Sequence, residues 1–208
     1  MKEGEAAFAA ARDVSRETLE QLNVYAALLD KWNPRINLVS RSTLPSLWAR
    51  HFLDSAQIFD LAPEMAARWC DLGSGGGFPG LVVAILAQAE RPALSVTLIE
   101  SDKRKAGFLR TVARETGLKI VVLSERLEEA EGQAADVLSA RALAPLPTLL
   151  SHADRHLAPG GLCLFPKGVR HDEERRSALE LWRFRCETLP SRTDPDAVIF
   201  RISELSRA

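Results

Sequence analysis

The sequence contains little cysteine and few histidines, and it lacks long apolar runs. Its three cysteines, Cys70, Cys163 and Cys186, form no Cys-x-x-Cys pair, and together with the four histidines they match no zinc-finger spacing. We therefore expect free thiols in a reducing compartment and no bound metal. No apolar run reaches the roughly 18 residues that a membrane span needs, and acidic residues stand where a signal peptide requires basic ones. These absences predict a cytoplasmic protein without membrane association.

The chain also lacks an excess of charge of either sign. Its 27 basic and 28 acidic residues leave a formal net charge of −1, which excludes a polycation that binds nucleic acid indiscriminately. Only six of the basic residues are lysines, so arginine, whose fork suits phosphates and base edges, supplies most of the positive charge. Any nucleic-acid binding must therefore use a local patch.

The composition and periodicity indicate one core with a helical extension. A chain of 208 residues that is 46% hydrophobic is an ordinary globular protein and not a disordered one. Apolar residues recur at helical spacing over 15–30 and 44–61, and Pro34 is expected to end the first of these helices. We expect residues 1–65 to form a helical extension that packs on a core formed by residues 66–208.

Beyond residue 65, short apolar runs alternate with helical patterns, which is typical of βαβ units and a mostly parallel sheet. A Pro-Gly-Gly turn at 159–161 leads into the fifth strand, and 190–195 predicts a hairpin loop before the last one. The predicted strands are 68–71, 95–100, 120–124, 137–141, 162–166 and 197–202, and the predicted helices are 80–89, 103–116, 147–157 and 173–182.

A glycine-rich turn connects the first predicted strand to the first helix of the core. Gly75, Gly77 and Gly80 have the GxGxxG spacing, which several classes of nucleotide site share. Such glycines let backbone approach a ligand and supply N–H groups at a helix N-terminus. The stretch predicts a ligand-binding loop.

Two acids accompany the loop. Asp71 lies two residues before Gly73, and we expect its carboxylate to face the ligand, which suits a cationic amino-acid group better than a pyrophosphate. Glu100 ends the next strand, where an acid binds the hydroxyls of a ribose. In the alternative interpretation the glycines only make a turn and Glu100 caps the next helix. The regular order of strand, loop, helix, strand and acid favours the binding site.

These features together resemble the class I S-adenosylmethionine-dependent methyltransferases. More narrowly, the chain resembles the guanine-N7 methyltransferases of bacterial small-subunit ribosomal RNA. The glycine loop that ends in Phe-Pro-Gly, with His-x-x-Asp-Ser ahead of it, is the most specific part. The matching segments are Lys31-Trp-Asn, Asn37-Leu-Val-Ser, Arg50-His-Phe-Leu-Asp-Ser, Asp71-Leu-Gly-Ser-Gly-Gly-Gly-Phe-Pro-Gly, Arg126-Leu-Glu-Glu, Ser139-Ala-Arg-Ala and Pro166-Lys-Gly.

The resemblance implies an α/β fold with a mostly parallel, seven-stranded sheet covered by helices on both faces. It also implies methyl transfer from S-adenosylmethionine to N7 of one guanine in 16S ribosomal RNA. Gly76, where relatives often have proline, and Glu100, where they often have aspartate, depart from the family pattern. The expected cofactor-binding residues, from the loop and the resemblance together, are Asp71, Gly73, Gly75, Gly77, Phe78, Glu100, Leu127, Glu128 and Arg141.

The chemistry of guanine N7 predicts which side chains act. N7 carries an in-plane lone pair, so its methylation needs no general base, and no Asn-Pro-Pro-Tyr motif follows the fourth strand. The side chain that holds the base must contact O6 and leave N7 free, which excludes the usual arginine–guanine fork. Arg141 and Lys167, at the carboxyl ends of neighbouring strands, are the catalytic candidates, and Lys167 is also expected to bind the substrate.

Lys103, Arg110 and Arg114 form a basic stripe on the helix after Glu100. We expect this stripe to bind RNA phosphates, although a solvated helix face is an equally good interpretation. Because the protein is nearly neutral, we expect its substrate to be a structured ribonucleoprotein, the small subunit or an assembly intermediate. Nothing in the sequence requires more than a monomer.

Three questions stay open at this stage. His51 and Asp54 lie three residues apart on one helical face, where a structural role is more common than acid–base chemistry. A small nicotinamide-dependent reductase, which would bind NADH and ignore S-adenosylhomocysteine, is the first rival function. A non-catalytic module, which would bind the cofactor without turnover, is the second.

Overall fold

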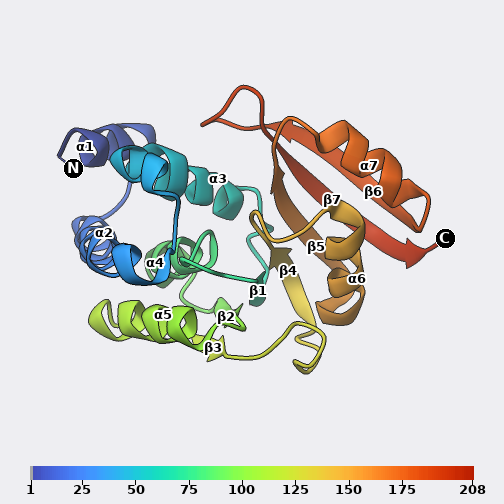
Figure 1. Cartoon of the computed structure of the whole chain (residues 1–208), viewed down its shortest axis with the longest axis horizontal. Helices are drawn as coiled ribbons and strands as arrows, with labels where there is room; N and C mark the ends of the chain where they lie inside the picture. The colour runs from blue at the N-terminus through green and yellow to red at the C-terminus, as the bar shows by residue number, and fades with distance from the viewer. Residues whose placement is uncertain (1) are drawn as a thin grey trace.

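A seven-stranded sheet runs through the computed structural model, which describes residues 2–208 (Figure 1). The strand order is β3-β2-β1-β4-β5-β7-β6; β1 to β5 are parallel, and β7 is antiparallel to both of its neighbours. This arrangement confirms the predicted mostly parallel sheet of seven strands. The strands are β1 (Arg68–Leu72), β2 (Ser95–Ile99), β3 (Val121–Leu123), β4 (Ala135–Ser139), β5 (Leu157–Lys167), β6 (Trp182–Pro190) and β7 (Val198–Arg207).

Helices cover both faces of this sheet. The core helices are α4 (Gly80–Glu90), α5 (Lys103–Glu115), α6 (Leu146–His156) and α7 (His171–Leu179). Ahead of them come α1 (Lys2–Ala11), α2 (Arg16–Ile36), a 3-10 turn η1 (Arg41–Ser46), a π-helical turn η2 (Trp48–Leu53) and α3 (Asp54–Asp60). Among residues 2–208, no helix is both long and apolar enough to cross a membrane.

Two apolar clusters lie on opposite faces of the sheet, and the alternating side chains of the strands contribute to both. In β5, Leu162 and Leu164 join the cluster formed with α4, α5 and the N-terminal helices, while Cys163 and Phe165 join the cluster formed with α6 and α7. Successive side chains of a strand point to opposite faces, so the apolar run 162–165 contributes to both clusters.

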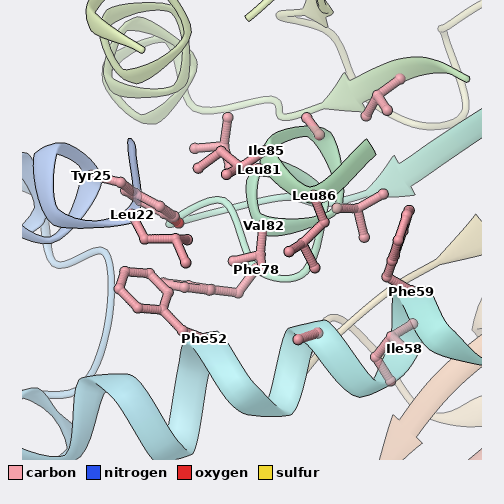
Figure 2. Packing of buried hydrophobic residues seen from close by; sticks show 14 of the residues in the cluster. Leu22, Tyr25, Phe52, Ile58, Phe59, Phe78, Leu81, Val82, Ile85 and Leu86 are labelled. Carbon is pink, nitrogen blue, oxygen red and sulfur yellow. The ribbon is translucent and has the colours of Figure 1, made fainter. Parts of the chain in front are cut away.

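The N-terminal helices share the first of these clusters with the core (Figure 2). Tyr25 of α2 stacks on Phe78 of the glycine loop with ring centroids 5.2 Å apart, and Phe52 of η2 lies 5.3 Å from the Tyr25 ring. All three rings are buried. The division into residues 1–65 and 66–208 stays a prediction, because the two parts meet in one continuous apolar cluster.

Pro34 does not end α2, contrary to the sequence prediction. It lies in the last turn, and the helix continues to Ile36. Asn37 then adopts φ 48°, and its N–H donates to the carbonyl of Asn33, which closes the helix with a left-handed cap. A proline this close to the C-terminal end removes a single helical hydrogen bond, so the remaining turns hold.

The two ends of the chain also differ from the predicted elements. Trp182 begins β6 instead of ending a helix, because it pairs with Arg207 of β7 and its ring is buried under that guanidinium. The sequence analysis did not predict α1, because its apolar residues show only a weak helical periodicity. The helix is held by Phe8, whose ring packs on Trp48. In both places a distant partner decides the local structure.

Candidate functional site

A cavity of about 1060 Å³ opens at the carboxyl ends of the parallel strands. Such crevices are where open α/β sheets bind their ligands. The lining comes from both parts of the chain. It includes residues 38–40, 43, 50, 51 and 54 of the N-terminal segment, 73–76 and 78 of the glycine loop, 99–101, 125–128, 140–145 and 166–168 after successive strands, and 191, 193 and 194 of the β6–β7 hairpin.

The glycine loop presents backbone to this cavity. Gly73 and Gly75 line it with φ of +62° and +54°, a left-handed conformation that glycine adopts without strain. Gly77, also predicted to bind the cofactor, is not among the lining residues. It has φ +95°, and a Cβ there would lie 2.6 Å from the Tyr25 hydroxyl oxygen and would also overlap Leu81. Gly77 therefore permits close packing of α2 and α4 behind the loop.

Asp71 lies behind the loop and not against the cavity, where the sequence analysis expected it. Its carboxylate is fully buried; Oδ1 accepts a hydrogen bond of 2.6 Å from the Ser139 hydroxyl, and Oδ2 accepts one of 3.3 Å from the Gly80 N–H. These bonds connect β1 to β4 and to the first turn of α4. Asp71 thus holds the frame on which the loop rests.

Replacing Asp71 with asparagine is expected to remove a pH-dependent part of the free energy of unfolding. Burial raises the pKa of the Asp71 carboxyl from 3.8 to about 6, so the folded state holds this proton more tightly than the unfolded chain. Between these pH values the stability contributed by Asp71 falls as pH rises, by about 1.4 kcal/mol per pH unit and about 3 kcal/mol in total. Urea titrations between about pH 4 and pH 7 measure the difference between the two proteins.

A matched control for this experiment is Asp136→Asn. Burial tends to raise the pKa of Asp136, but hydrogen bonds from the Ala67 and Arg68 N–H groups lower it overall. Its stabilising contribution is therefore lost as pH falls, which is the opposite sign. A stability difference between wild type and Asp71→Asn that stays constant across the range would contradict the prediction.

Glu100 follows β2 and lines the cavity with a side chain that is nearly buried. Its Oε2 accepts the Gly75 N–H at 2.8 Å, and its Oε1 accepts the Asp102 N–H at 2.8 Å. Each carboxylate oxygen has a second lone pair, so the group can hold the glycine loop and still accept hydrogen bonds from two ligand hydroxyls.

The loop after β3 forms another part of the wall. Leu127 and Glu128, both expected to bind the cofactor, line the cavity. His156 of α6 is completely buried, and its Nε2 lies 2.9 Å from the Leu127 carbonyl oxygen; His152 lies 3.7 Å from the Glu128 carboxylate. Helix α6 therefore holds this loop in place.

Arg141, which follows β4, is held by the N-terminal segment. Its Nη2 lies 2.7 Å from Nδ1 of His51, and its Nη1 donates to the Arg50 carbonyl at 3.2 Å and to Asp54 at 3.4 Å. The guanidinium carbon lies 4.9 Å from the centre of the Phe78 ring. The structure thus joins Arg141 to the pair His51 and Asp54, which sequence reasoning had placed together but not connected to Arg141.

Lys167, the other catalytic candidate, lines the cavity with an ammonium group that already has protein partners. Its Nζ lies 2.7 Å from Glu174 of α7 and donates to the Ala144 carbonyl at 3.1 Å. Glu174 also accepts the Leu146 N–H at 2.8 Å. Lys167 therefore ties the segment after β4 to α7, and two of its three donors are in use.

The basic stripe of α5 lies outside the cavity wall. Arg110 donates to the Val122 carbonyl at 2.8 Å, Arg114 pairs with Glu115 at 2.9 Å, and Lys103 is exposed at the helix start. Lys105, which the sequence analysis did not single out, does line the cavity. The stripe therefore begins beside the cavity mouth and runs away from it.

Sequence reasoning missed two residues of α2 that shape the site. The hydroxyl of Tyr25, the chain's single tyrosine, donates to the Gly76 carbonyl. Asn33 is buried, and its Oδ1 accepts the N–H groups of Leu38 and Val39 at 2.7 and 2.9 Å, which fixes the segment that crosses the cavity. For Asn33 the sequence offered two signals, its place directly before Pro34 and its place at the end of the matching segment Lys31-Trp-Asn.

The cavity fits a cofactor that carries an adenosyl group. At Gly75 an added Cβ would meet nothing closer than 3.8 Å, so bare backbone leaves room for a ligand. Glu100 supplies acceptors suited to ribose hydroxyls, and Leu127 supplies apolar surface suited to a base. In residues 2–208 no group of three or more His, Cys, Asp or Glu side chains is arranged to hold a metal ion.

Comparisons with known proteins agree on one family. The family model described as GidB, rRNA small subunit methyltransferase G, matches residues 18–192. A ribosomal RNA small subunit methyltransferase G from Ruegeria sp. (strain TM1040) is 54% identical over 195 residues, which cover 94% of this chain and 95% of the relative. Another, from Rhodospirillum centenum, is 56% identical over 199 residues, 96% of this chain and 90% of the relative.

Solved structures show the same fold at low sequence identity. A methyltransferase from Geobacter sulfurreducens superposes with a TM-score of 0.61 at 17% identity, over 87% of this chain and 88% of that one. An O-methyltransferase from Bacillus cereus, in complex with SAH, gives a TM-score of 0.61 at 13% identity, over 96% of both chains. The fold is therefore that of the class I methyltransferases, as the sequence analysis expected.

Proposed function

Since the chain belongs to the rRNA small subunit methyltransferase G family, we propose that it methylates N7 of one guanine in 16S ribosomal RNA, with S-adenosylmethionine as the methyl donor. The observation that carries this proposal is one cavity with two halves. The glycine loop and Glu100 form one half, and Arg141 and the segment after β4 form the other. A cofactor and a base can therefore meet between them.

The first half of the cavity would hold the cofactor. S-Adenosylmethionine supplies a methyl group activated by a positively charged sulfur. Gly73 and Gly75 would let backbone approach it, Glu100 would accept from the ribose hydroxyls, and Phe78 closes the loop beneath Arg141. Leu127 and Glu128 would contact the adenine, and Asp71 and Gly77 act from behind by holding the loop.

The second half would hold the guanine. N7 carries no proton, so its methylation releases none and the chain needs no general base. Accordingly, the Nδ1 lone pair of His51, a cavity residue, is already bound to Arg141. We assign the contact with O6 to Arg141, and we assign Lys167 the role of fixing Ala144 and Leu146 through its ion pair with Glu174. Alignment of the reacting atoms then supplies the rate acceleration.

We also propose that the stripe formed by Lys103, Arg110 and Arg114 contacts RNA phosphates beyond the cavity mouth. Lys103→Ala and Arg114→Ala are each expected to weaken RNA binding and to lower the slope of log K against log salt by about one. Arg207→Ala is the control, because that side chain pairs with Asp154 at the far end of β7. Filter binding of 16S RNA over a salt series measures the slopes. A flat salt response of the wild type would contradict the proposal.

The near-zero net charge supports a structured substrate, so we propose that the enzyme acts on the small subunit or an assembly intermediate. We also propose that it acts as a monomer and in the cytoplasm. The test is transfer of labelled methyl groups to small subunits and to deproteinised 16S RNA, both from cells without the enzyme. Chemical cleavage at 7-methylguanine then maps the site. We expect one labelled guanine. S-Adenosylhomocysteine binding without any labelling would overturn the assignment, and NADH binding would favour the reductase.

A further inference from the structure

His51 stands between the segment that crosses the cavity and the arginine after β4. Its Nδ1 lies 2.7 Å from Arg141 Nη2, and its Nε2 lies 2.9 Å from the Thr43 hydroxyl. That hydroxyl lies 2.8 Å from the Ser40 carbonyl oxygen. The imidazole is 8% exposed and packs against Phe78, with ring centroids 4.9 Å apart. A continuous chain of hydrogen bonds therefore runs from Ser40 to Arg141.

Only one assignment of protons satisfies this chain. A guanidinium has donors and no acceptor, so Nδ1 of His51 must be the unprotonated, accepting nitrogen. The proton of the neutral imidazole is then on Nε2, which donates to Thr43, and the Thr43 hydroxyl donates to the Ser40 carbonyl. Burial, together with the charges of Arg141 and Arg50, lowers the pKa of His51 to about 3, which keeps the ring neutral.

The remaining contacts restrain Arg141 further. Its two Nη1 hydrogens go to the Arg50 carbonyl and to Asp54, and its flat face lies over Phe78. Within residues 2–208, the Nε hydrogen and the second Nη2 hydrogen have no assigned partner, and Arg141 lines the cavity. The protein thus occupies some of the donors of this side chain and leaves the others for a ligand.

We propose that His51 is a positioning residue for Arg141: its Nδ1 lone pair fixes the guanidinium, and Thr43 locks the imidazole in the tautomer that makes this possible. The neutral imidazole accepts from Nη2 without placing a second carboxylate beside the guanidinium, which already pairs with Asp54 at 3.4 Å. The inference rests on the proposed function, because Arg141 is assigned there to the base. It also gives His51 a role that excludes proton transfer.

A double-mutant cycle on methyl transfer tests the proposal. His51→Leu is expected to lower kcat by about 10- to 100-fold, the effect of losing one charge-assisted hydrogen bond. His51→Asn, whose Oδ1 replaces Nδ1, is expected to stay within about 3-fold of wild type, whereas His51→Gln, whose amide reaches instead toward Thr43, is expected to resemble His51→Leu. In an Arg141→Ala background, measured in single turnovers, His51→Leu should have no further effect. Equal losses in both backgrounds would show that His51 does not act through Arg141.

A second measurement does not depend on activity. In protein labelled with nitrogen-15 at histidine, long-range proton–nitrogen spectra are expected to show His51 with Nε2 protonated and Nδ1 bare at neutral pH. With four histidines in the chain, His51→Asn identifies its signals. Arg141→Ala should shift the Nδ1 signal, and Thr43→Val should shift the Nε2 signal while Arg141 keeps Nδ1 bare. A protonated Nδ1 in the wild type would overturn the inference, whether or not the protein transfers methyl groups. Absence of methyl transfer would instead overturn the proposed function.

Discussion

Arg141→Ala is expected to lower kcat for methyl transfer by about 10²- to 10³-fold, the range found when one preorganised donor is removed from an active site. The guanidinium is held by the Arg50 carbonyl, His51, Asp54 and the Phe78 ring, so it is already oriented before a ligand binds. Because positive charge moves onto the purine in the reaction, a cation beside O6 gains no attraction in the transition state. The contribution of Arg141 is orientation, since a donor fixed beside O6 holds N7 in line with the methyl group. Rates with saturating small subunits measure the effect.

Two controls separate chemistry from folding in this experiment. Arg141→Lys keeps the charge but loses the planar fork, and we expect it to recover only part of the lost rate. Arg16→Ala removes a solvent-exposed arginine of α2 that pairs with Glu20 and does not line the cavity, and it should leave kcat unchanged. If the Arg141→Ala enzyme turned over within about 3-fold of wild type, Arg141 would not contact the base.

Gly77→Ala is expected to destabilise the protein by about 2–6 kcal/mol and to abolish binding of S-adenosylhomocysteine. The φ of +95° costs about 1–3 kcal/mol in a residue with a side chain. The added Cβ would also lie 2.6 Å from the Tyr25 hydroxyl and would overlap Leu81, and such overpacking costs about 1–3 kcal/mol. Displacing Tyr25 breaks its hydrogen bond to Gly76, so the glycine loop moves with it.

Gly75→Ala is the matched control, because it lies in the same loop with φ +54° and an added Cβ would have 3.8 Å of clearance. We expect it to cost about 1 kcal/mol, from backbone strain alone. Urea unfolding compares the stability of the two variants. Calorimetric titration compares Gly77→Ala with wild type alone, because a Cβ at Gly75 would enter the space left for the ligand. Equal losses of stability would mean that the contact with Tyr25 and Leu81 does not explain why position 77 is glycine.

Much of the fold follows from local sequence. The alternation of apolar runs with helical patterns predicts β1, α4, β2 and α5 in order, because the strands are short apolar runs, α4 is apolar almost all round and α5 has one apolar side. The elements that sequence reasoning missed depend on distant partners. Strand β6 exists because it pairs with β7, and α1 is held by the contact between Phe8 and Trp48.

The site divides in the same way. By itself, the sequence determined which residues stand at the carboxyl ends of the strands, and hence that Gly73, Glu100 and Arg141 line one cavity, because parallel strands end at a common edge. Only the tertiary structure decided what each side chain does there. The carboxylate of Asp71 lies behind the glycine loop, where it accepts a hydrogen bond from Ser139. The guanidinium of Arg141 donates to His51, ninety positions away in the sequence. Hydrogen bonds between such distant residues depend on how helices pack across the sheet, and no local pattern encodes that packing.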